Sequence, residues 1–432
     1  MRINVINIGC FKNLVDCEKL MKQLTMAGHD VYFGESNSLF DIAIINTCGF
    51  IGNADSDSLQ LLKQYAKRKS ECTIKELWVM GCYSQKRGEK LRNDIPEVDR
   101  IYGNFDWENI LVDLGAKSVI SQERTLTTPG HYAYLKISEG CNSPCSYCIK
   151  PKINGPLSSY DIKELVNEAK YLVRNGVKEL QFVAQNLTVY GLDIYKEKRI
   201  TDLVNRIADI DGVEWIRLHY AYPIGFPLDL LDTIRERENV CNYLDMAIQH
   251  CNTKMLKLMR RNMTKEQLTE LIATIRDRVP GIYLRTTVMT GHPGETQSDF
   301  DELYEFVKRQ RFERMGVFAY SHQSGTYCDK NYVDEIPQSV KIERALSLMS
   351  LQSSIYESLN DSLVGTVEKV IIDERSGNYY IGRSQHSTPM ADPRVFIKSN
   401  VELKNGSFYN VKYVGYHHRD LIAETLKYCD RF

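Results

Sequence analysis

Three cysteines lie within eight residues in the stretch ISEGCNSPCSYCIKP, at Cys141, Cys145 and Cys148. This Cys-x3-Cys-x2-Cys spacing lets one short loop give three thiolates to an iron–sulfur cluster and leaves the fourth iron without a protein ligand. A zinc site is the alternative, but zinc normally takes a fourth Cys or His, and no His follows at the spacing of a zinc finger or ribbon. The spacing therefore predicts a 4Fe-4S cluster with one open iron.

A second set of three cysteines shares a position in the fold rather than a short spacing. Cys10, Cys48 and Cys82 are 38 and 34 residues apart, in NIGC, NTCG and MGCY, and each follows a predicted strand. The carboxyl ends of parallel strands meet at one sheet edge, where open α/β folds bind ligands. The three thiols would converge at that edge and leave one metal position open. The alternative is that they are three unrelated packing residues, because Cys is often buried. The other cysteines share no such placement and are interpreted as packing residues: Cys17, Cys72, Cys241, Cys251, Cys328 and Cys429.

The strands that would carry the second set belong to an amino-terminal region from Met1 to about Ala116. Short β-branched runs alternate there with amphipathic stretches, which predicts a doubly wound parallel sheet covered by helices on both faces. The predicted strands are Ile3–Ile8, Asp41–Thr47 and Glu76–Gly81, and the predicted helices are Asn13–Gly28, Ser56–Arg68 and Gln85–Arg92. A polar linker with Pro and Gly, Ser121–Gly130, ends the region.

The central region, His131 to about Asn360, repeats the alternation on a larger scale. Its predicted strands are Tyr132–Ile137, Glu179–Ala184, Val213–His219, Tyr243–Ile248, Tyr283–Met289 and Met315–Ser321. Six strand–helix units predict an open, TIM-like (βα)6 partial barrel with its active site at the carboxyl ends of the strands. A long predicted helix, Gln338–Leu359, leads to Leu363–Phe432, where five short strands between turn residues predict a small all-β barrel.

The composition is that of an ordinary globular protein. Hydrophobic residues make up 43% and charged residues 26%, and the 55 basic and 56 acidic residues give a net charge of −1, so no global basic excess points to nucleic acid. We find no apolar run as long as a membrane span and no secretory signal, and we therefore expect a cytoplasmic protein. In that reducing compartment, twelve cysteines indicate metal binding or catalysis rather than disulfides.

Across essentially its whole length the chain resembles the radical-SAM methylthiotransferases. CNSPCSYC after AYLKISEG resembles their cluster motif, NIGCFKNLVDCE, NTCGFI and GCYSQ resemble their auxiliary-cluster domain, and the last five strands resemble their TRAM barrel. The resemblance continues through VAQNLTVYG, RLHYAYP, LKLMRR and RTTVMTGHPGET. It implies an auxiliary-cluster domain at 1–120, a radical-SAM domain at 131–360 and a TRAM domain at 363–432. It also implies that Cys10, Cys48 and Cys82 hold a second 4Fe-4S cluster.

The resemblance further implies the chemistry. The open iron of the first cluster would bind the amino and carboxylate groups of S-adenosyl-L-methionine, and an electron from a low-potential donor would cleave this cofactor to a 5′-deoxyadenosyl radical. The second cluster would hold a sulfur that is methylated and then transferred to the carbon from which the radical has removed hydrogen. NTCGFI, the following IGNADSDS and RLHYAYP most resemble the branch of the family that modifies the β-carbon of an aspartate in small-subunit ribosomal protein S-twelve. A tRNA adenosine methylthiotransferase is the alternative.

The charge of the predicted carboxyl-terminal barrel bears on that choice. Val364–Phe432 carries ten Lys+Arg and eight Asp+Glu, a net charge of +2, which is weaker and less clustered than a nucleic-acid module needs. A protein substrate is therefore favoured. We expect it to dock around Tyr379, Tyr380 and Pro389–Pro393. The alternative is that these tyrosines form the barrel's own core. We expect a monomer without a membrane partner. A non-enzymatic iron–sulfur electron carrier is a further alternative, but such carriers usually have four cysteines per cluster.

Position and resemblance identify cofactor contacts, but no catalytic acid or base. Tyr147 lies between two cluster cysteines, where the superfamily places an aromatic side chain beside the adenine. Gln185, Gln249 and Arg285 lie at or just past predicted barrel strands, so their side chains are candidates to face the cofactor. Three further residues share that placement, but structural roles explain them equally well: His219, His250 and Glu295.

The chain departs from the family pattern shortly after the cysteine run. In IKPKINGPLSSY, Asn154 precedes Gly155 and Tyr160 follows Ser159, where the family usually has an arginine or similar residue before the glycine and a basic residue after the serine. No cluster ligand is lost. We expect the departure to affect a polar contact near the site, and with it the choice of substrate or the efficiency of the reaction.

Overall fold

The computed structural model describes residues 1–36, 38–49, 54–104, 106–117 and 122–426. The chain forms two compact units. The first comprises Met1–Thr128, Tyr134–Ser143 and Ile149–Tyr171, and the second comprises Pro129–Ala133, Pro144–Cys148 and Leu172–Phe432. No helix within the described ranges is long and apolar enough to cross a membrane.

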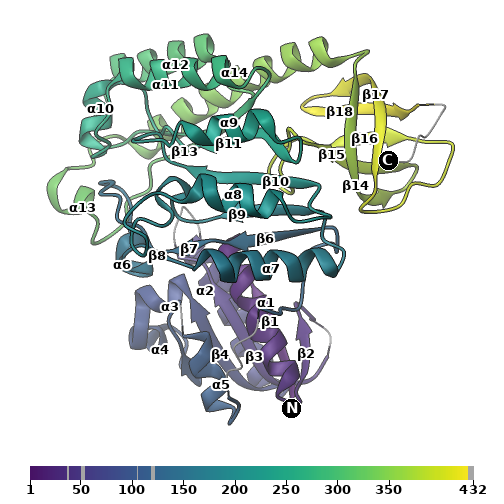
Figure 1. The fold of residues 1–432 in the computed structure, drawn as a ribbon. Coiled ribbons are helices and arrows are strands. Elements are labelled where there is room, and N and C mark those ends of the chain that lie inside the picture. The colour runs from purple at the N-terminus through teal and green to yellow at the C-terminus, as the bar shows by residue number, and fades with distance from the viewer. Residues whose placement is uncertain (37, 50–53, 105, 118–121, 427–432) are drawn as a thin grey trace. The chain divides into compact units, whose positions relative to one another are not determined.

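The first unit is built on a parallel five-stranded sheet with the strand order β2-β1-β3-β4-β5 (Figure 1). Its strands are β1 (Arg2–Asn7), β2 (Asp30–Phe33), β3 (Phe40–Thr47), β4 (Ile74–Gly81) and β5 (Arg100–Ile101). Its helices are α1 (Phe11–Met26), α2 (Ala54–Ser70), α3 (Cys82–Arg87), the short 3-10 helix η1 (Gly88–Lys90), α4 (Leu91–Asp94) and α5 (Trp107–Asp113). The doubly wound sheet expected for this region is confirmed.

Two hydrophobic clusters cover the two faces of this sheet. On one face, Ile42 and Ile44 of β3 pack with Leu20 of α1. On the other face, Ala43 and Ile45 of the same strand pack in the cluster that contains the buried residues of α2. Alternate residues of one strand thus face opposite cores, which is the pattern of a parallel sheet buried on both sides.

The segments that follow the linker complete the first unit and lead into the second. The short strands β7 (Ser138–Glu139) and β8 (Ser158–Ser159) pair antiparallel. The short helix α6 (Lys150–Asn154) lies between them in the chain, and α7 (Ile162–Arg174) follows.

A six-stranded sheet has the strand order β13-β12-β11-β10-β9-β6; its strands β9 to β13 belong to the second unit and pair in parallel. Its strands are β6 (Tyr132–Lys136), β9 (Glu179–Val183), β10 (Trp215–Ala221), β11 (Val240–Met246), β12 (Tyr283–Thr290) and β13 (Arg314–Ala319). The connecting helices are η2 (Leu187–Val189), α8 (Ile200–Ala208), α9 (Asp229–Glu236), α10 (Thr253–Leu258), α11 (Lys265–Arg278), α12 (Gln297–Gln310) and α13 (Tyr327–Asn331). All six expected barrel strands are present, and the open partial barrel is confirmed.

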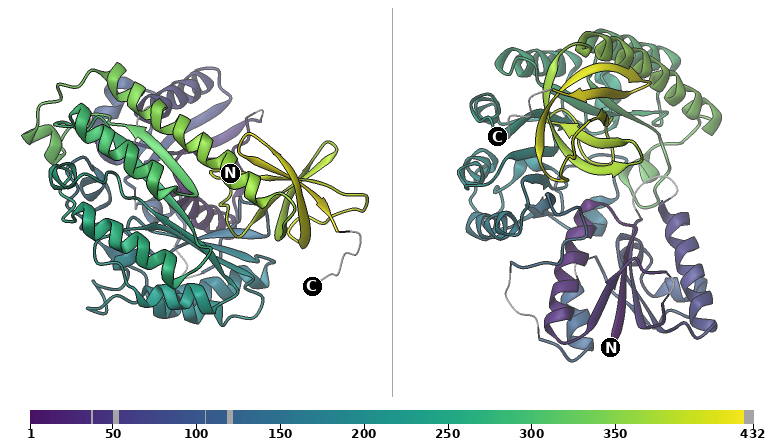
Figure 2. Two further views of the ribbon diagram at one scale, coloured as in Figure 1. Left: turned by 90° about the horizontal axis from the view of Figure 1, so that it is seen from above. Right: turned by 90° about the vertical axis from the view of Figure 1, so that its right-hand side faces the viewer.

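The helix α14 (Gln338–Leu363) leads from this sheet to a closed five-stranded barrel in the order β14-β15-β16-β18-β17, seen in the right-hand view of Figure 2. Its strands are β14 (Val367–Ser376), β15 (Tyr379–Ser384), β16 (Val395–Lys398), β17 (Phe408–His417) and β18 (Asp420–Thr425). Tyr380 is buried in the barrel's own core, whereas Tyr379 is half-buried with its ring edge against Phe396.

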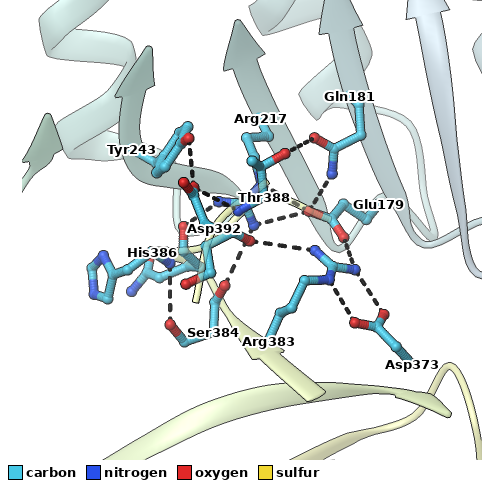
Figure 3. A network of polar contacts seen from close by, with 12 residues as sticks. Glu179, Gln181, Arg217, Tyr243, Asp373, Arg383, Ser384, His386, Thr388 and Asp392 are labelled. Carbon is cyan, nitrogen blue, oxygen red and sulfur yellow. Dashed lines mark hydrogen bonds and ion pairs between the residues drawn. The ribbon is translucent and has the colours of Figure 1, made fainter. Parts of the chain in front are cut away.

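Buried charges join this small barrel to the six-stranded sheet (Figure 3). Glu179, the first residue of β9, is fully buried and pairs with Arg217 of β10 at 2.9 Å and with Arg383 of β15 at 2.8 Å. Arg383 also holds Asp373 of β14 at 2.7 Å. Both carboxylates are matched by buried cations, which is the condition under which charges are tolerated in a protein interior.

The loop between β15 and β16 continues this interface toward β11 and β12. The hydroxyl of Tyr243 donates to Asp392 Oδ2 at 2.7 Å (Figure 3). Arg285 Nε lies 3.3 Å from Asp392 Oδ1. Thr388 Oγ lies 3.4 Å from Gln181 Oε1. None of these partners lies at the carboxyl end of its strand, where the active site is expected. The predicted docking surface at Pro389–Pro393 is therefore mostly buried inside the second unit, with only Met390 and Ala391 exposed.

Candidate active site and metal centres

Three loops at the carboxyl edge of the first unit's sheet carry Cys10, Cys48 and Cys82. Cys10 follows β1 and caps α1, Cys48 follows β3 directly, and Cys82 follows β4 directly as the first residue of α3. The three strands are neighbours, and they end within one residue of the same register. The structure therefore places the three loops together, and the role of the cysteines as ligands stays a prediction.

A glycine beside each of these cysteines lets the loops approach closely. A Cβ on Gly49 would lie 2.9 Å from Cα of Tyr83, and a Cβ on Gly81 would lie 2.8 Å from the backbone nitrogen of Thr47. Gly81 also has φ of 99°, which other residues adopt only with strain. Gly9 leaves room for a side chain of α1. The sequences NIGC, NTCG and MGCY thus supply both the thiols and the space between the loops.

The thiols of this set interact electrostatically. Burial, together with the nearby thiols of Cys10 and Cys48, raises the pKa of Cys82 to about 12. Burial also acts to raise the pKa of Cys10, but the ammonium groups of Lys12 and Lys150 and the backbone N–H groups at the start of α1 outweigh it, and the net pKa is lowered. Iron would enforce deprotonation of all three thiols, and these cations and N–H groups offset the resulting charge. The donor set therefore fits a cluster with three thiolate ligands.

Cys141 lies in the part of the other cysteine loop that belongs to the first unit. Its N–H donates to the carbonyl of Gly155 at 3.1 Å, and the N–H of Ser143 donates to Cys141 Sγ at 3.4 Å. Gly140, with φ of 64°, lies against the backbone of Pro156, where a Cβ would clash. Backbone contacts thus fix the start of this loop.

Cys145 and Cys148 lie in the part of the loop that belongs to the second unit, and Ser146, one of the two residues between them, is anchored by several hydrogen bonds. The N–H of Ser146 donates to the carbonyl of Met259 at 3.0 Å, and the carbonyl of Ser146 accepts from the N–H of Cys328 at 2.7 Å. The hydroxyl of Ser146 lies 3.1 Å from His292 Nε2. This segment is therefore held by three separate parts of the second unit.

The guanidinium of Arg261 lies beside this cysteine segment. It lies 4.3 Å from the ring centre of Tyr222 and 3.3 Å from the hydroxyl of Tyr147, and it donates to the carbonyl of Ala247 at 2.6 Å. Tyr222 in turn has its hydroxyl 3.6 Å from Cys145 Sγ. Burial and the nearby Cys145 thiol raise the pKa of Tyr147. A thiolate-bound cluster would be stabilised by this arginine.

Among the described residues, no three His, Cys, Asp or Glu side chains are grouped so as to hold one metal ion. An iron–sulfur cubane makes a different demand, because each thiolate binds a different iron atom.

The other predicted cofactor contacts have different surroundings. Gln185 follows β9, and Gln249 follows β11 in a backbone conformation with φ of 67°, with its N–H donating to the carbonyl of Thr287 at 2.8 Å. Both therefore lie at the carboxyl ends of barrel strands. Arg285 is the third residue of β12 and pairs with Asp245 at 3.5 Å as well as with the carboxylate of the β15–β16 loop. Its role at the cofactor stays a prediction with less structural support.

The three residues for which structural roles were left open have protein partners. His219 Nε2 lies 2.6 Å from Gln181 Oε1, and Glu295 pairs with Arg344 at 2.6 Å. His250 is fully buried and its Nδ1 accepts from the N–H of Asn252 at 2.9 Å; burial lowers its pKa to about 3, so it is neutral at physiological pH. These partners favour the structural interpretation.

Three residues that contact the cysteines or their neighbours were not identified from the sequence: Arg261, Tyr222 and Asn13, whose Oδ1 lies 3.2 Å from Cys10 Sγ. Arg261 and Tyr222 lie in LKLMRR and RLHYAYP, and Asn13 lies in NIGCFKNLVDCE, so the motifs that carried the family resemblance contained the signal. Of the cysteines interpreted as packing residues, four are buried, Cys72 is exposed, and Cys429 lies outside the described residues.

The two positions that depart from the family pattern lie in the first unit. Asn154 ends α6 and is buried. The ring of Tyr160 lies 5.3 Å from the ammonium of Lys19, and burial together with the nearby Glu139 raises the pKa of the Tyr160 hydroxyl, although the ammonium of Lys136 opposes the shift. Tyr160 thus borders a buried group of charges in which Lys136 pairs with Asp16 and Glu139.

Three family models match the chain. The Radical SAM superfamily matches residues 135–307, the uncharacterized protein family UPF0004 matches residues 2–103, and the TRAM domain matches residues 364–426. Solved structures with a similar fold include the radical S-adenosylmethionine methyltransferase TsrM from Kitasatospora setae, with a TM-score of 0.56, 12% identity, and coverage of 76% of this chain and 77% of that one. The cobalamin-dependent radical enzyme OxsB has a TM-score of 0.54 at 10% identity, and the match covers 81% of this chain and 56% of OxsB. At these identities the likeness concerns the fold alone.

Relatives at much higher identity cover nearly the whole chain. The protein named ribosomal protein uS12 methylthiotransferase RimO from Bacteroides thetaiotaomicron is 51% identical over 428 residues, which are 98% of each chain. The protein of the same name from Porphyromonas gingivalis is 50% identical, and the match covers 98% of this chain and 99% of that protein. The one from Cytophaga hutchinsonii is 44% identical, and the match covers 99% of this chain and 98% of that protein. With its three matched domains and this similarity from end to end, the chain belongs to the RimO family of radical-SAM methylthiotransferases.

Proposed function

We propose that the chain transfers a methylthio group to the β-carbon of an aspartate in uS12, the small-subunit ribosomal protein S-twelve. The observation that carries the proposal is the presence of two sets of three cysteines, one in a short loop and one gathered at a sheet edge. Each set leaves one iron of a 4Fe-4S cluster without a protein ligand. The names of the relatives support uS12 as the substrate.

In this proposal the two sets have separate tasks. Cys141, Cys145 and Cys148 hold the cluster that binds S-adenosyl-L-methionine, and the set at the sheet edge holds the auxiliary cluster. When bound, these groups supply a carbon radical that removes hydrogen from an unactivated carbon, and the methylthio group that replaces it. Arg261 keeps Tyr147 and Tyr222 in place beside Cys145 and offsets the negative charge of the thiolates.

The protein's contacts to the cofactor would come from the carboxyl ends of the barrel strands. Tyr147 would lie beside the adenine, and Gln185 and Gln249 would donate or accept hydrogen bonds at the cofactor's polar groups. Arg285 would act there only if it exchanged its present carboxylate partners for the cofactor's carboxylate.

The substrate assignment rests on the relatives and on charge. A net charge of +2 over Val364–Phe432 provides little counterion release on RNA, which disfavours tRNA as the substrate. A ribosomal-protein substrate implies that the reaction takes place in the cytoplasm. We also propose that the enzyme acts as a monomer and takes electrons from a low-potential donor. We place its three domains at residues 1–120, 131–360 and 363–432, and each contains one of the family matches.

The division of tasks can be tested with two triple variants. Replacing Cys141, Cys145 and Cys148 by Ala should abolish 5′-deoxyadenosine formation from S-adenosyl-L-methionine. Replacing the other set should remove roughly half the iron, on the assumption of two equal clusters, while cofactor cleavage stays measurable. Cys241→Ala, at a buried cysteine outside both sets, is the matched control. Full iron and normal methylthio transfer in the second variant would contradict the proposal.

A further inference from the structure

Three buried asparagines surround the thiols at the sheet edge of the first unit. Asn13 on α1, Asn46 near the end of β3 and Asn104 after β5 are 4%, 0% and 3% exposed. Asn13 Nδ2 donates to Asn46 Oδ1 at 2.9 Å and lies 3.2 Å from Asn104 Oδ1. The three carboxamides thus form a connected network from three different segments of the first unit.

Two members of this network contact the thiols directly. Cys10 Sγ donates to Asn13 Oδ1 at 3.2 Å, and Cys82 Sγ donates to Asn104 Oδ1 at 3.5 Å. Asn13 Nδ2 lies 4.0 Å from Cys82 Sγ, so this side chain stands between the two cysteines. In this arrangement the carboxamide oxygens accept hydrogen bonds from protonated thiols.

Iron binding would reverse what the thiols require. A thiolate has no proton to donate, and its sulfur is stabilised by N–H donors instead. A carboxamide can serve both states, because a half-turn of its amide exchanges the oxygen acceptor for the NH2 donor at nearly the same position. Aspartate, which has the same shape, can only accept and adds a negative charge.

We propose that Asn13 and Asn104 are positioning residues of the auxiliary cluster that turn an N–H toward the sulfurs of Cys10 and Cys82 when the cluster is bound. Asn46 Nδ2 holds the backbone carbonyl of Asn13 at 3.1 Å, a bond that the turn of the Asn13 amide leaves intact, whereas the bond from Asn13 Nδ2 to Asn46 Oδ1 belongs to the arrangement with protonated thiols. Hydrogen bonds to the sulfurs of a cluster raise its reduction potential, because they stabilise the more negative reduced state. The proposal rests on the auxiliary cluster proposed above.

Asn13→Asp and Asn104→Asp test this role in the full-length, anaerobically reconstituted protein. The readout is a potentiometric titration followed by electron paramagnetic resonance, in which the auxiliary cluster is the one whose signal is unchanged by S-adenosyl-L-methionine. At a fixed potential we expect each variant to shift the ratio of oxidised to reduced auxiliary cluster about tenfold toward the oxidised form, which corresponds to about 59 mV for a one-electron couple. The potential of the other cluster should stay the same.

Asn4→Asp is the matched control. Asn4 is fully buried in the first half of β1, and its side chain bonds the backbone of Glu35 at 2.6 and 3.2 Å. This variant introduces the same charge into the same sheet without approaching a thiol. Its auxiliary cluster should have the potential of the parent protein.

The possible outcomes separate this role from the auxiliary cluster itself. Loss of auxiliary iron in the Asn13 and Asn104 variants, with iron retained in Asn4→Asp, would support the role, because these carboxamides would then be needed for the thiolates. Auxiliary clusters with unchanged iron and unchanged potential in both variants would overturn it and leave the proposed function intact. A parent protein that binds the iron of only one cluster would overturn both.

Discussion

Glu179→Gln is the most revealing single change at the interface between the six-stranded sheet and the small barrel. The Glu179 carboxylate is fully buried between Arg217 at 2.9 Å and Arg383 at 2.8 Å and also accepts from Gln181 at 2.6 Å. The amide would keep the shape of the side chain but leave two buried guanidinium groups without this counter-charge. Arg383 retains the carboxylate of Asp373, so one cation keeps an ionic partner.

Removing one partner of a buried ion pair costs about 3–5 kcal/mol of unfolding free energy. For a unit of this size that corresponds to a fall in Tm of roughly 6–20 °C, at about 2–4 °C per kcal/mol. Burial acts to raise the pKa of Glu179, but the charges of Arg383 and Arg217 outweigh it and lower the pKa from its ordinary value of 4.5. The stabilisation is therefore fully present above pH 4.5 and is lost as the pH falls through the lowered pKa, so the difference between parent and variant should shrink in acid.

Thermal unfolding of the reconstituted protein under anaerobic conditions measures this effect. Glu214→Gln is the matched control, because Glu214 pairs with Lys369 of the same small barrel at 3.4 Å but both side chains are exposed, at 46% and 40%. Such a pair contributes about 0–1 kcal/mol. If Glu179→Gln unfolded at the same temperature as Glu214→Gln, the interface would not depend on buried charge.

Three further changes follow from the same contacts. Deleting Val364–Phe432 should destabilise the radical-SAM sheet and reduce cofactor cleavage as well as substrate modification, because it strips the buried ion pairs from the sheet; a truncated protein that cleaves S-adenosyl-L-methionine at the parent rate would contradict this. Arg261→Met should weaken binding of S-adenosyl-L-methionine in equilibrium dialysis, because Tyr147 and Tyr222 lose the guanidinium that holds them beside Cys145. Arg260→Met, at an exposed neighbour, should leave the binding unchanged. Gly81→Ala should lower auxiliary iron without lowering cofactor cleavage, because the new Cβ meets the backbone of Thr47 at a φ of 99°; Gly28→Ala, at an open position with φ of 84°, controls for backbone strain alone.

The sequence predicted the elements that position the cysteines because these elements have strong local patterns. β1, β3 and β4 each contain a run of at least four buried residues, and the thiols follow each strand directly or within three residues. The edge strands β2 and β5 were missed because they are short and partly exposed, so neither shows a hydrophobic pattern. The helix predicted at Gln85–Arg92 is broken instead at Gly88, which has φ of 52°.

The polar interface could not be predicted from local pattern. Arg217 and Arg383 are fully buried, yet a charged residue in a strand normally indicates a solvent-facing side. Their partners are distant in sequence: Glu179 precedes Arg217 by 38 residues, and the carbonyl of Gln385, which also bonds Arg217, follows it by 168. For the same reason the Pro389–Pro393 segment was interpreted as an exposed docking loop, although Asp392 bonds Tyr243, 149 residues away.

The substrate is tested most directly by mass spectrometry of ribosomal proteins and tRNA from a strain that lacks the gene, beside its parent. We expect uS12 from the parent to carry one sulfur and one methylene more than uS12 from the deletion strain, at an aspartate, and the tRNA of the two strains to be identical. Unchanged uS12 together with loss of a methylthio-adenosine from tRNA would contradict the uS12 assignment and identify tRNA as the substrate.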